Sequence, residues 1–126
     1  MTSEVQKAID EIRELFPGVE LKAEDDGQGG AFVEVEPIDL GEKYSPSQTW
    51  CGFHITFQYP RSDVYPHFLG ADVKRGDGSA FGQGVSMQQW RGKPALQLSR
   101  RSNRLDPTVD TAATKLAKVI SWFKAL

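Results

Sequence analysis

The feature that most constrains the fold is an apolar run that ends in two Tyr-Pro pairs. Large apolar side chains alternate along the run from Trp50 to Tyr59, which favours a β-strand with one buried face. Tyr59-Pro60 ends the run, and Tyr65-Pro66 follows shortly afterwards. Proline fixes its own φ, restricts the preceding residue to extended backbone and lacks an amide donor. We therefore expect the chain to leave the sheet here and to cross to another strand.

Two amphipathic helices are expected at the ends of the chain. Between Val5 and Phe16 apolar residues recur at three-and-four spacing, and Ser3 followed by Gln6 forms a capping-box pattern. These signals predict a helix that begins at Ser3. Near the other end, Asp106-Pro107 combines a capping side chain with a proline suited to the first helical position. The apolar stripe that follows predicts a second helix that begins there.

The intervening segments predict a small antiparallel sheet. Period-two alternation in residues 19–24 and 31–36, separated by a glycine-rich turn, indicates a hairpin. The apolar run supplies a third strand, and Leu69–Lys74 a fourth. The glycine-rich segment 76–84 lacks the spacing of a phosphate-binding loop and is expected to be irregular, with only short extended pieces in 88–99. The sequence therefore predicts one α+β domain spanning residues 1–126: an N-terminal helix, a four-stranded antiparallel meander, a long irregular loop and a C-terminal helix.

Composition narrows the functional classes. The 126 residues contain no apolar run that approaches a membrane span and no N-terminal leader pattern, so a cytoplasmic protein is expected. A lone cysteine, Cys51, and two histidines exclude a disulfide scaffold and give no metal or cofactor site. The net charge of −2 conceals an acidic first half and a basic second half. The two halves either neutralise one another across the fold or form a basic docking face, whereas nucleic acid is not an expected partner.

The run from Ile55 through Tyr59-Pro60 to Tyr65-Pro66 resembles the ubiquitin-conjugating (E2) superfamily, in which an apolar strand leads into an aromatic-proline pair and a Tyr-Pro follows. The segment Ser99–Pro107, together with Asp110-Thr111, is also similar to bacterial E2-like proteins of ubiquitin-like conjugation operons. The resemblance implies a UBC/RWD-like fold. It further implies partners: a ubiquitin-like protein, an E1-like activating enzyme or an active E2.

The catalytic cysteine of an active E2 is missing. The resemblance places that position near Ser86 and Met87, before the last helix, and the His-Pro-Asn motif of the family is absent as well. Three interpretations remain open: a non-catalytic E2-like binding or scaffolding domain (a pseudoenzyme), an active E2 whose cysteine has been replaced at Ser86, or Cys51 as nucleophile. We expect the first, with no catalytic residue. Cys51 is the least expected nucleophile, because it opens an apolar strand where a thiol is usually buried and inert. An unrelated α+β adaptor that shares only the proline-rich loop is a further alternative.

Candidate partner-binding residues lie between positions 61 and 104 of the chain. His67 follows Tyr65-Pro66 in an expected loop, where it would titrate near neutral pH. Trp90, beside Arg91, is either a binding hot spot or a core residue, whereas Trp50 and Trp122 are expected in the core. The arginines near the last helix either form ion pairs with Asp106 and Asp110, which we favour, or bind a carboxylate of a partner. The full set is Arg61, Tyr65, His67, Trp90, Arg100, Arg101 and Arg104.

Overall fold

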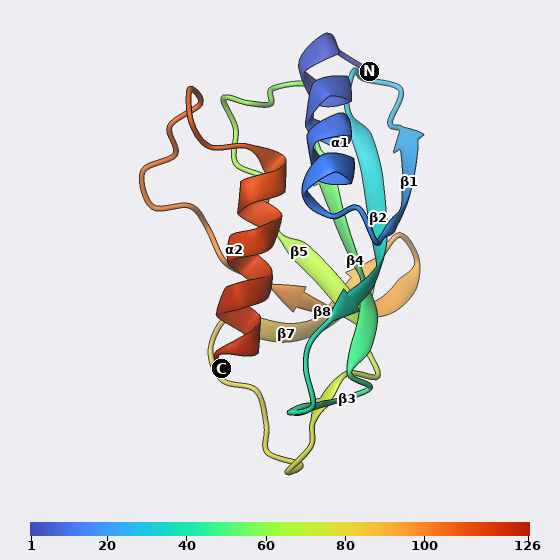
Figure 1. The fold of residues 1–126 in the computed structure, drawn as a ribbon, viewed down its shortest axis with the longest axis vertical. Coiled ribbons are helices and arrows are strands. Elements are labelled where there is room, and N and C mark those ends of the chain that lie inside the picture. The colour runs from blue at the N-terminus through green and yellow to red at the C-terminus, as the bar shows by residue number, and fades with distance from the viewer.

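Two helices lie on one face of a six-stranded antiparallel sheet in the computed structural model, which describes residues 1–126 (Figure 1). The sheet order is β1-β2-β4-β5-β8-β7, and β3 pairs with β6 in a separate two-stranded ribbon. The predicted α+β class, with a helix at each end of an antiparallel sheet, is confirmed. The elements are α1 (Ser3–Leu15), β1 (Glu20–Asp25), β2 (Ala31–Asp39), β3 (Tyr44–Ser45), β4 (Gln48–Ile55), β5 (His67–Gly70), β6 (Lys74–Arg75), β7 (Val85–Trp90), β8 (Lys93–Leu98) and α2 (Ala112–Lys124).

Helix α1 begins where it was predicted, with a cap shifted by one residue. The Thr2 hydroxyl, rather than that of Ser3, accepts a hydrogen bond from the Val5 amide at 3.1 Å. Glu4 in the first turn complements the helix dipole. The buried stripe of α1 faces the sheet, and neither helix is both long and apolar enough to cross a membrane. The stripe consists of Val5, Ala8, Ile9 and Ile12.

The apolar run forms β4, but the strand is shorter than its alternation indicates. Phe53 and Ile55 are fully buried, and β4 ends at Ile55. The Tyr59 amide then donates to the Thr56 carbonyl at 3.0 Å, so the chain turns before the first proline. This turn leaves Phe57 53% exposed instead of on the buried face. Both Tyr-Pro peptide bonds are cis.

The predicted four-stranded meander is wrong in extent, because a further hairpin widens the sheet. Antiparallel neighbours β1, β2, β4 and β5 supply the predicted part, and β8 and β7 are added beyond β5. Arg91 and Gly92 join β7 to β8 with φ values of 49° and 86°. Positive φ at both central residues is the geometry of a two-residue turn that matches the strand twist. The expected irregular loop is therefore confined to the residues before β7.

Helix α2 begins at Ala112, several residues later than predicted. Asp106 caps no helix, because its carboxylate accepts the Thr108 amide at 3.0 Å within a local turn. The helix is capped by Thr111 and Thr114, whose side chains exchange hydrogen bonds with each other's backbone amides. This reciprocal capping satisfies amides that the first turn leaves without helical partners.

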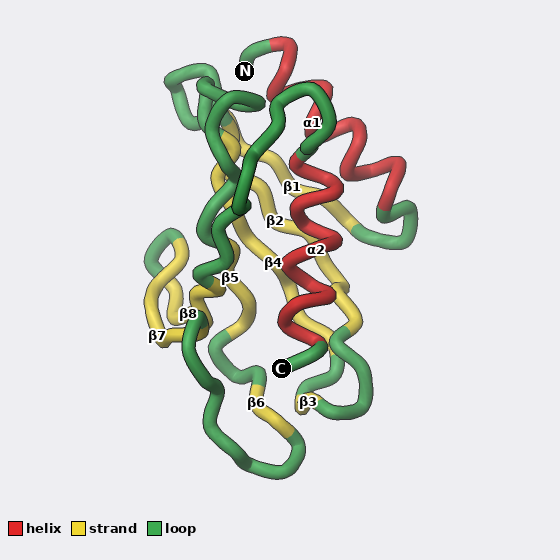
Figure 2. The backbone as a smooth tube through the Cα atoms, turned by 90° about the vertical axis from the view of Figure 1, so that its left-hand side faces the viewer, coloured by secondary structure: helices red, strands yellow, loops and turns green.

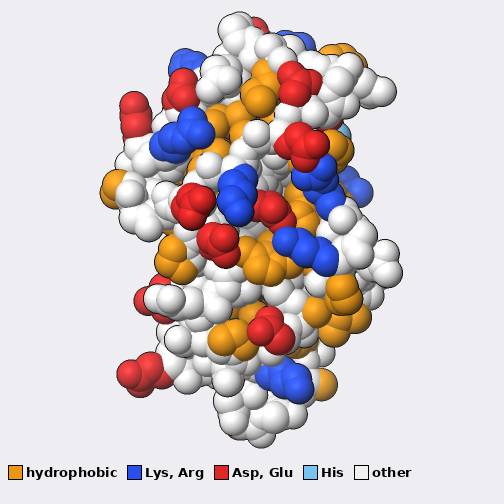
Figure 3. Space-filling model, turned by 90° about the vertical axis from the view of Figure 1, so that its right-hand side faces the viewer, with side chains coloured by type: hydrophobic (Ala, Val, Ile, Leu, Met, Phe, Trp, Pro, Cys, Tyr) orange, Lys and Arg blue, Asp and Glu red, His pale blue; other side chains and the backbone are white.

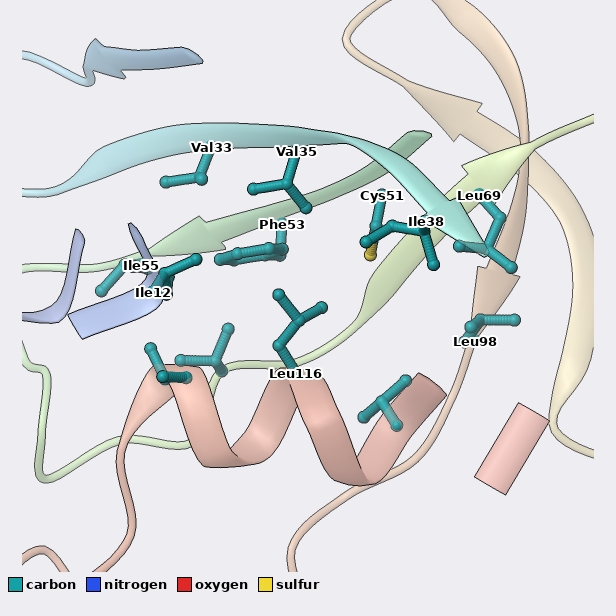
Figure 4. Packing of buried hydrophobic residues seen from close by; sticks show 14 of the residues in the cluster. Ile12, Val33, Val35, Ile38, Cys51, Phe53, Ile55, Leu69, Leu98 and Leu116 are labelled. Atoms are coloured by element: carbon teal, nitrogen blue, oxygen red, sulfur yellow. The ribbon is translucent and has the colours of Figure 1, made fainter. Parts of the chain in front are cut away.

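The core lies between the helices and the sheet. Figure 4 shows Leu116 of α2 pointing toward Phe53 and Val35 of the sheet, with Cys51 in the same layer. Leu116, Phe53, Val35 and Cys51 are all fully buried. At one end of this layer the Tyr59 hydroxyl accepts a hydrogen bond from the Ala112 amide at 2.9 Å. The loop after β4 therefore supports the first turn of α2 directly.

Replacing Tyr59 with phenylalanine tests this support. Tyr59→Phe leaves the buried Ala112 amide without an acceptor, so we expect the free energy of unfolding to fall by about 1–3 kcal/mol. Tyr65→Phe is the matched control, since the Tyr65 hydroxyl makes no hydrogen bond to the protein, and it should change stability by less than about 0.5 kcal/mol. Chemical denaturation measures both, and equal losses for the two variants would contradict the support.

Candidate functional site

Two loops that are far apart in sequence, the loop after β4 and the loop of residues 99–111, meet against the first half of α2 (Figure 2). The Asp63 carboxylate accepts the Ser102 amide at 2.7 Å and the Ser102 hydroxyl at 2.9 Å. The Lys115 ammonium donates to Asp63 Oδ2 at 3.0 Å and to Ser102 Oγ at 2.9 Å. We call Asp63, Ser102 and Lys115 the anchor network.

The anchor network is largely shielded from water. The side chains of Lys115 and Asp63 are 8% and 18% exposed. Burial acts to raise the pKa of Asp63, but hydrogen bonds from Ser102 and Lys115 outweigh it and hold that pKa below its usual range. The adjoining cavity of about 20 Å³ has room for roughly one water molecule. The network is therefore suited to fixing the chain rather than to receiving a ligand.

A larger hollow of about 400 Å³ opens next to the anchor network, between residues 100–104 and the outer side of α2. Most of its charged residues are basic, and the half-buried ring of Trp122 contributes an apolar wall. Asp110 is the single acidic residue of the lining. We call this hollow the arginine concavity. It is lined by Arg100, Arg101, Ser102, Asn103, Arg104, Asp110, Lys115, Lys118, Val119 and Trp122.

The three arginines of this concavity do not form the ion pairs expected with Asp106 and Asp110. None of the salt bridges in the protein involves Arg100, Arg101 or Arg104. Asp106 and Asp110 instead accept hydrogen bonds from nearby amides, and Asp110 lies 3.8 Å from the Lys118 ammonium. The prediction of ion pairs is wrong because short-range backbone contacts engage both carboxylates first.

Aromatic rings hold two of these guanidinium groups. Arg101 lies over the ring of Tyr65 at 4.1 Å from its centroid, and Arg100 over that of Trp122 at 5.7 Å. Such contacts position a cation without occupying its N–H donors with a carboxylate. Arg104 has φ of 112°, a left-handed conformation that costs a non-glycine residue roughly 1–3 kcal/mol and often marks a functional segment.

His67 does not lie in a loop, and that prediction is wrong. It is in β5, fully buried against Phe53, and neither ring nitrogen has a hydrogen-bond partner. Burial, reinforced by the charge of Lys115 and opposed by that of Asp63, lowers the pKa of His67 to about 3. The imidazole is therefore neutral and closed to a partner at neutral pH. The Tyr65-Pro66 pair indicates a loop, but strand β5 begins directly after it, at His67.

Trp90 is buried on the outer face of the sheet, the face that carries no helix. It is 5% exposed, and its indole N–H donates to Glu34 at 3.1 Å. A Cβ on Gly52 would lie 2.6 Å from the indole nitrogen, so the strand accommodates Trp90 only because it has glycine there. Of the two alternatives for Trp90, the structure therefore supports a core residue and not an exposed hot spot. Trp90 lies in a small second cluster with Phe68 and Ala95.

Charged residues cover that second cluster. Lys93 pairs with Glu34 at 2.6 Å and lies 4.0 Å from the ring centroid of Trp50, while Arg91 pairs with Glu24 and lies over Phe32. Figure 3, which shows the side opposite to Figure 2, has acidic and basic side chains interleaved with hydrophobic ones. Trp50, and likewise Trp122 on the helix side, is only half-buried rather than in the main core as expected.

The remaining predicted residues are dispersed. Ser86 and Met87 lie in the edge strand β7, with Met87 60% exposed, rather than in a loop. Cys51 is fully buried, and burial raises the pKa of its thiol to about 12. Arg61 is exposed and lies outside the arginine concavity. No group of three or more histidine, cysteine, aspartate or glutamate side chains is arranged to hold a metal ion.

Asp63, Ser102 and Lys115 were missed by the sequence analysis. Asp63 lies within the Tyr-Pro loop and Lys115 within the apolar stripe of a helix, and they are far apart in the chain. A lysine at a helix position whose neighbours Leu116 and Val119 are buried was the available signal. A charged group on a buried helix face requires a partner, although the sequence does not name that partner.

Removing one member of the anchor network should be costly. Lys115→Met leaves the Asp63 carboxylate without its cation, so we expect a loss of about 3–5 kcal/mol in the free energy of unfolding. The double variant Asp63→Asn with Lys115→Met should recover part of this loss. Lys118→Met, a change to an exposed lysine of the same helix, is the control. Urea denaturation measures all four proteins, and a neutral effect of Lys115→Met would exclude a structural role for the pair.

His67 predicts a specific pH dependence. Its folded-state pKa lies below the unfolded value of about 6.5, so the unfolded chain binds the proton first and stability falls as pH decreases below about 6.5. His67 should contribute a slope of about 1.4 kcal/mol per pH unit between roughly pH 6 and pH 4.5. His67→Leu removes that contribution and the two unpartnered nitrogens. A pH series of denaturation curves with an unchanged slope in His67→Leu would contradict a neutral, buried imidazole.

Comparisons with known proteins identify no relative of this chain. No family model, curated protein or solved structure matches the chain. Functional inference therefore rests on the arrangement of the residues themselves. Their most distinctive arrangement is a basic concavity held in place by a buried ion pair next to the Tyr-Pro loop.

Proposed function

We propose that this protein is a non-catalytic E2-like domain that binds or scaffolds protein partners in a bacterial ubiquitin-like conjugation pathway. The helix, antiparallel strands, Tyr-Pro loop and final helix follow one another in the order that the resemblance implies. The β7–β8 hairpin between the Tyr-Pro loop and α2 is a departure from the expected plan. We propose that the fold is UBC-like with this hairpin added to its sheet.

The burial of the only thiol carries the non-catalytic part of the proposal. Thioester formation requires a thiolate that can reach an activated carboxyl group, and Cys51 is fully buried with a pKa raised to about 12. The family's cysteine position falls in the edge strand β7, where Ser86 pairs with Gln97 of β8. A serine hydroxyl there has no histidine, lysine or carboxylate hydrogen-bonded to it to activate it.

The Tyr-Pro loop and the start of α1 supply the docking surface in this proposal. Phe57 is 53% exposed, and its Cβ lies 3.0 Å from where a Cβ on Gly29 would stand, close to Thr2 at the start of α1. Arg61 is exposed in the same loop. Aromatic and arginine side chains are enriched in binding hot spots, and one of each is exposed in this loop. The expected partners are a ubiquitin-like protein, an E1-like activating enzyme or an active E2.

The chemistry is tested by intact mass spectrometry. The protein and its Ser86→Cys variant are each incubated with an activating enzyme, ATP and a ubiquitin-like protein of the same genome. We expect no thioester adduct on either chain. An aromatic disulfide reagent serves as the control, because it should label the exposed cysteine of the Ser86→Cys variant while Cys51 stays unlabelled until the protein unfolds. An adduct on the variant alone would favour an active E2 with a replaced cysteine, and one on the unaltered chain would implicate Cys51.

Binding is tested with the ubiquitin-like proteins, activating enzymes and active E2 proteins of the same genome, each carrying a fluorophore. We expect at least one to bind, and Phe57→Ala and Arg61→Glu to weaken that affinity by about tenfold or more. Met87→Ala is a matched control, because it removes a similarly exposed apolar side chain from the edge strand β7. No binding by any of these proteins would contradict the proposal.

A further inference from the structure

We infer that the arginine concavity is a binding site for a small organic phosphate, independent of the docking of a protein partner. The inference rests on three properties of the lining: unpaired charge, prior positioning of the cations, and a volume larger than an inorganic anion requires. The Tyr-Pro surface proposed for partners, with Phe57 and Arg61, is not part of this lining.

The first property is charge without internal compensation. Arg13 and Arg91 each lie within salt-bridge distance of a carboxylate, whereas Arg100, Arg101 and Arg104 do not, although the chain carries more acidic than basic residues. Several planar guanidinium forks around one hollow match the oxygens of a phosphoryl group, which presents two negative charges. A single carboxylate would leave most of this positive charge unbalanced.

The second property is that the cations are positioned before a ligand arrives. Tyr65 and Trp122 hold Arg101 and Arg100 by contacts with their rings. Ser102, between Arg101 and Arg104 in the chain, is fixed through its amide and hydroxyl to Asp63. Binding therefore orders fewer side chains, which lowers its entropic cost.

The third property is size and lining. The volume of about 400 Å³ lies within the range of small-molecule sites and exceeds the need of a phosphate group alone. The half-buried ring of Trp122 forms an apolar wall next to the cations, which suits the organic part of a ligand. The positive charge is also local, since the whole chain is net negative. A compact phosphate ester fits these constraints better than the extended backbone of a nucleic acid.

The test is an NMR titration of the full chain, labelled with ¹⁵N, with ADP as the probe. The three tryptophan indole N–H signals report on location, because Trp122 lines the concavity whereas Trp50 and Trp90 belong to the cluster on the outer face. We expect ADP to shift the Trp122 signal and the amides of residues 100–104, and to leave the Trp50 and Trp90 signals in place.

Variants test the roles of the arginines. Arg101→Gln and Arg104→Gln should each weaken ADP binding by about tenfold or more. Lys22→Gln makes the same change in net charge on β1 and should leave the affinity unchanged. The inference is overturned if ADP at about 10 mM shifts none of these signals. The dissociation constant would then exceed about 10 mM, which is too weak for a dedicated binding site. Equal weakening by Lys22→Gln would also overturn it, because only a general charge effect would then remain.

Further probes define the ligand class. Pyrophosphate should bind more weakly than ADP, and equal affinities would exclude a contribution from the organic part. Glutarate should bind more weakly than either, and an affinity equal to that of ADP would show a carboxylate site instead. A phosphoserine peptide that binds more tightly than ADP would place the phosphate on a polypeptide and overturn the assignment to a small molecule.

Discussion

The burial of the Lys115 ammonium is the constraint on which the arrangement of the arginine concavity depends. A lysine that is almost withdrawn from water is stable only with a charge partner and hydrogen-bond acceptors, and Asp63 and Ser102 supply them. Because these residues come from a loop, a second loop and a helix, satisfying one charge fixes three segments together. Arg101 and Arg104, which flank Ser102 and Asn103 in the chain, are thereby kept beside α2 without a carboxylate partner.

The fold was predictable where one periodicity dominates a segment. The stripe of α1 and the alternation of β2 each specify one buried face, so both elements were predicted. Strand β1 is mostly exposed, and the glycine-rich turn that joins it to β2 was the signal for their pairing. Strands β7 and β8 were predicted only as short extended pieces within residues 88–99. Their full extent was not predicted because β7 is an edge strand with polar, exposed residues, and because an Arg91-Gly92 turn is a weak hairpin signal. The start of α2 was misplaced because Asp106-Pro107 offers the same local signals as a helix cap while forming an isolated turn.

The candidate site was predictable in its charges but not in its connections. The cluster of Arg100, Arg101 and Arg104 was visible as a charge pattern, but whether those arginines pair with nearby carboxylates depends on which amides reach the carboxylates first. His67 was misplaced because a residue next to a proline can either continue a loop or resume a strand. The link from Asp63 to Lys115 is a long-range contact, and no local pattern specifies it.

Hydrogen exchange at the Ser102 amide tests the central claim most directly. That amide belongs to a loop segment outside helices and strands, and its protection depends on the hydrogen bond to Asp63 at 2.7 Å. We expect slow exchange in the unaltered protein and fast exchange in Asp63→Ala, which has no acceptor for the Ser102 amide, with the amides of α1 unaffected in both. Fast exchange at Ser102 in the unaltered protein, or slow exchange that persists in Asp63→Ala, would contradict the anchoring of this loop by Asp63.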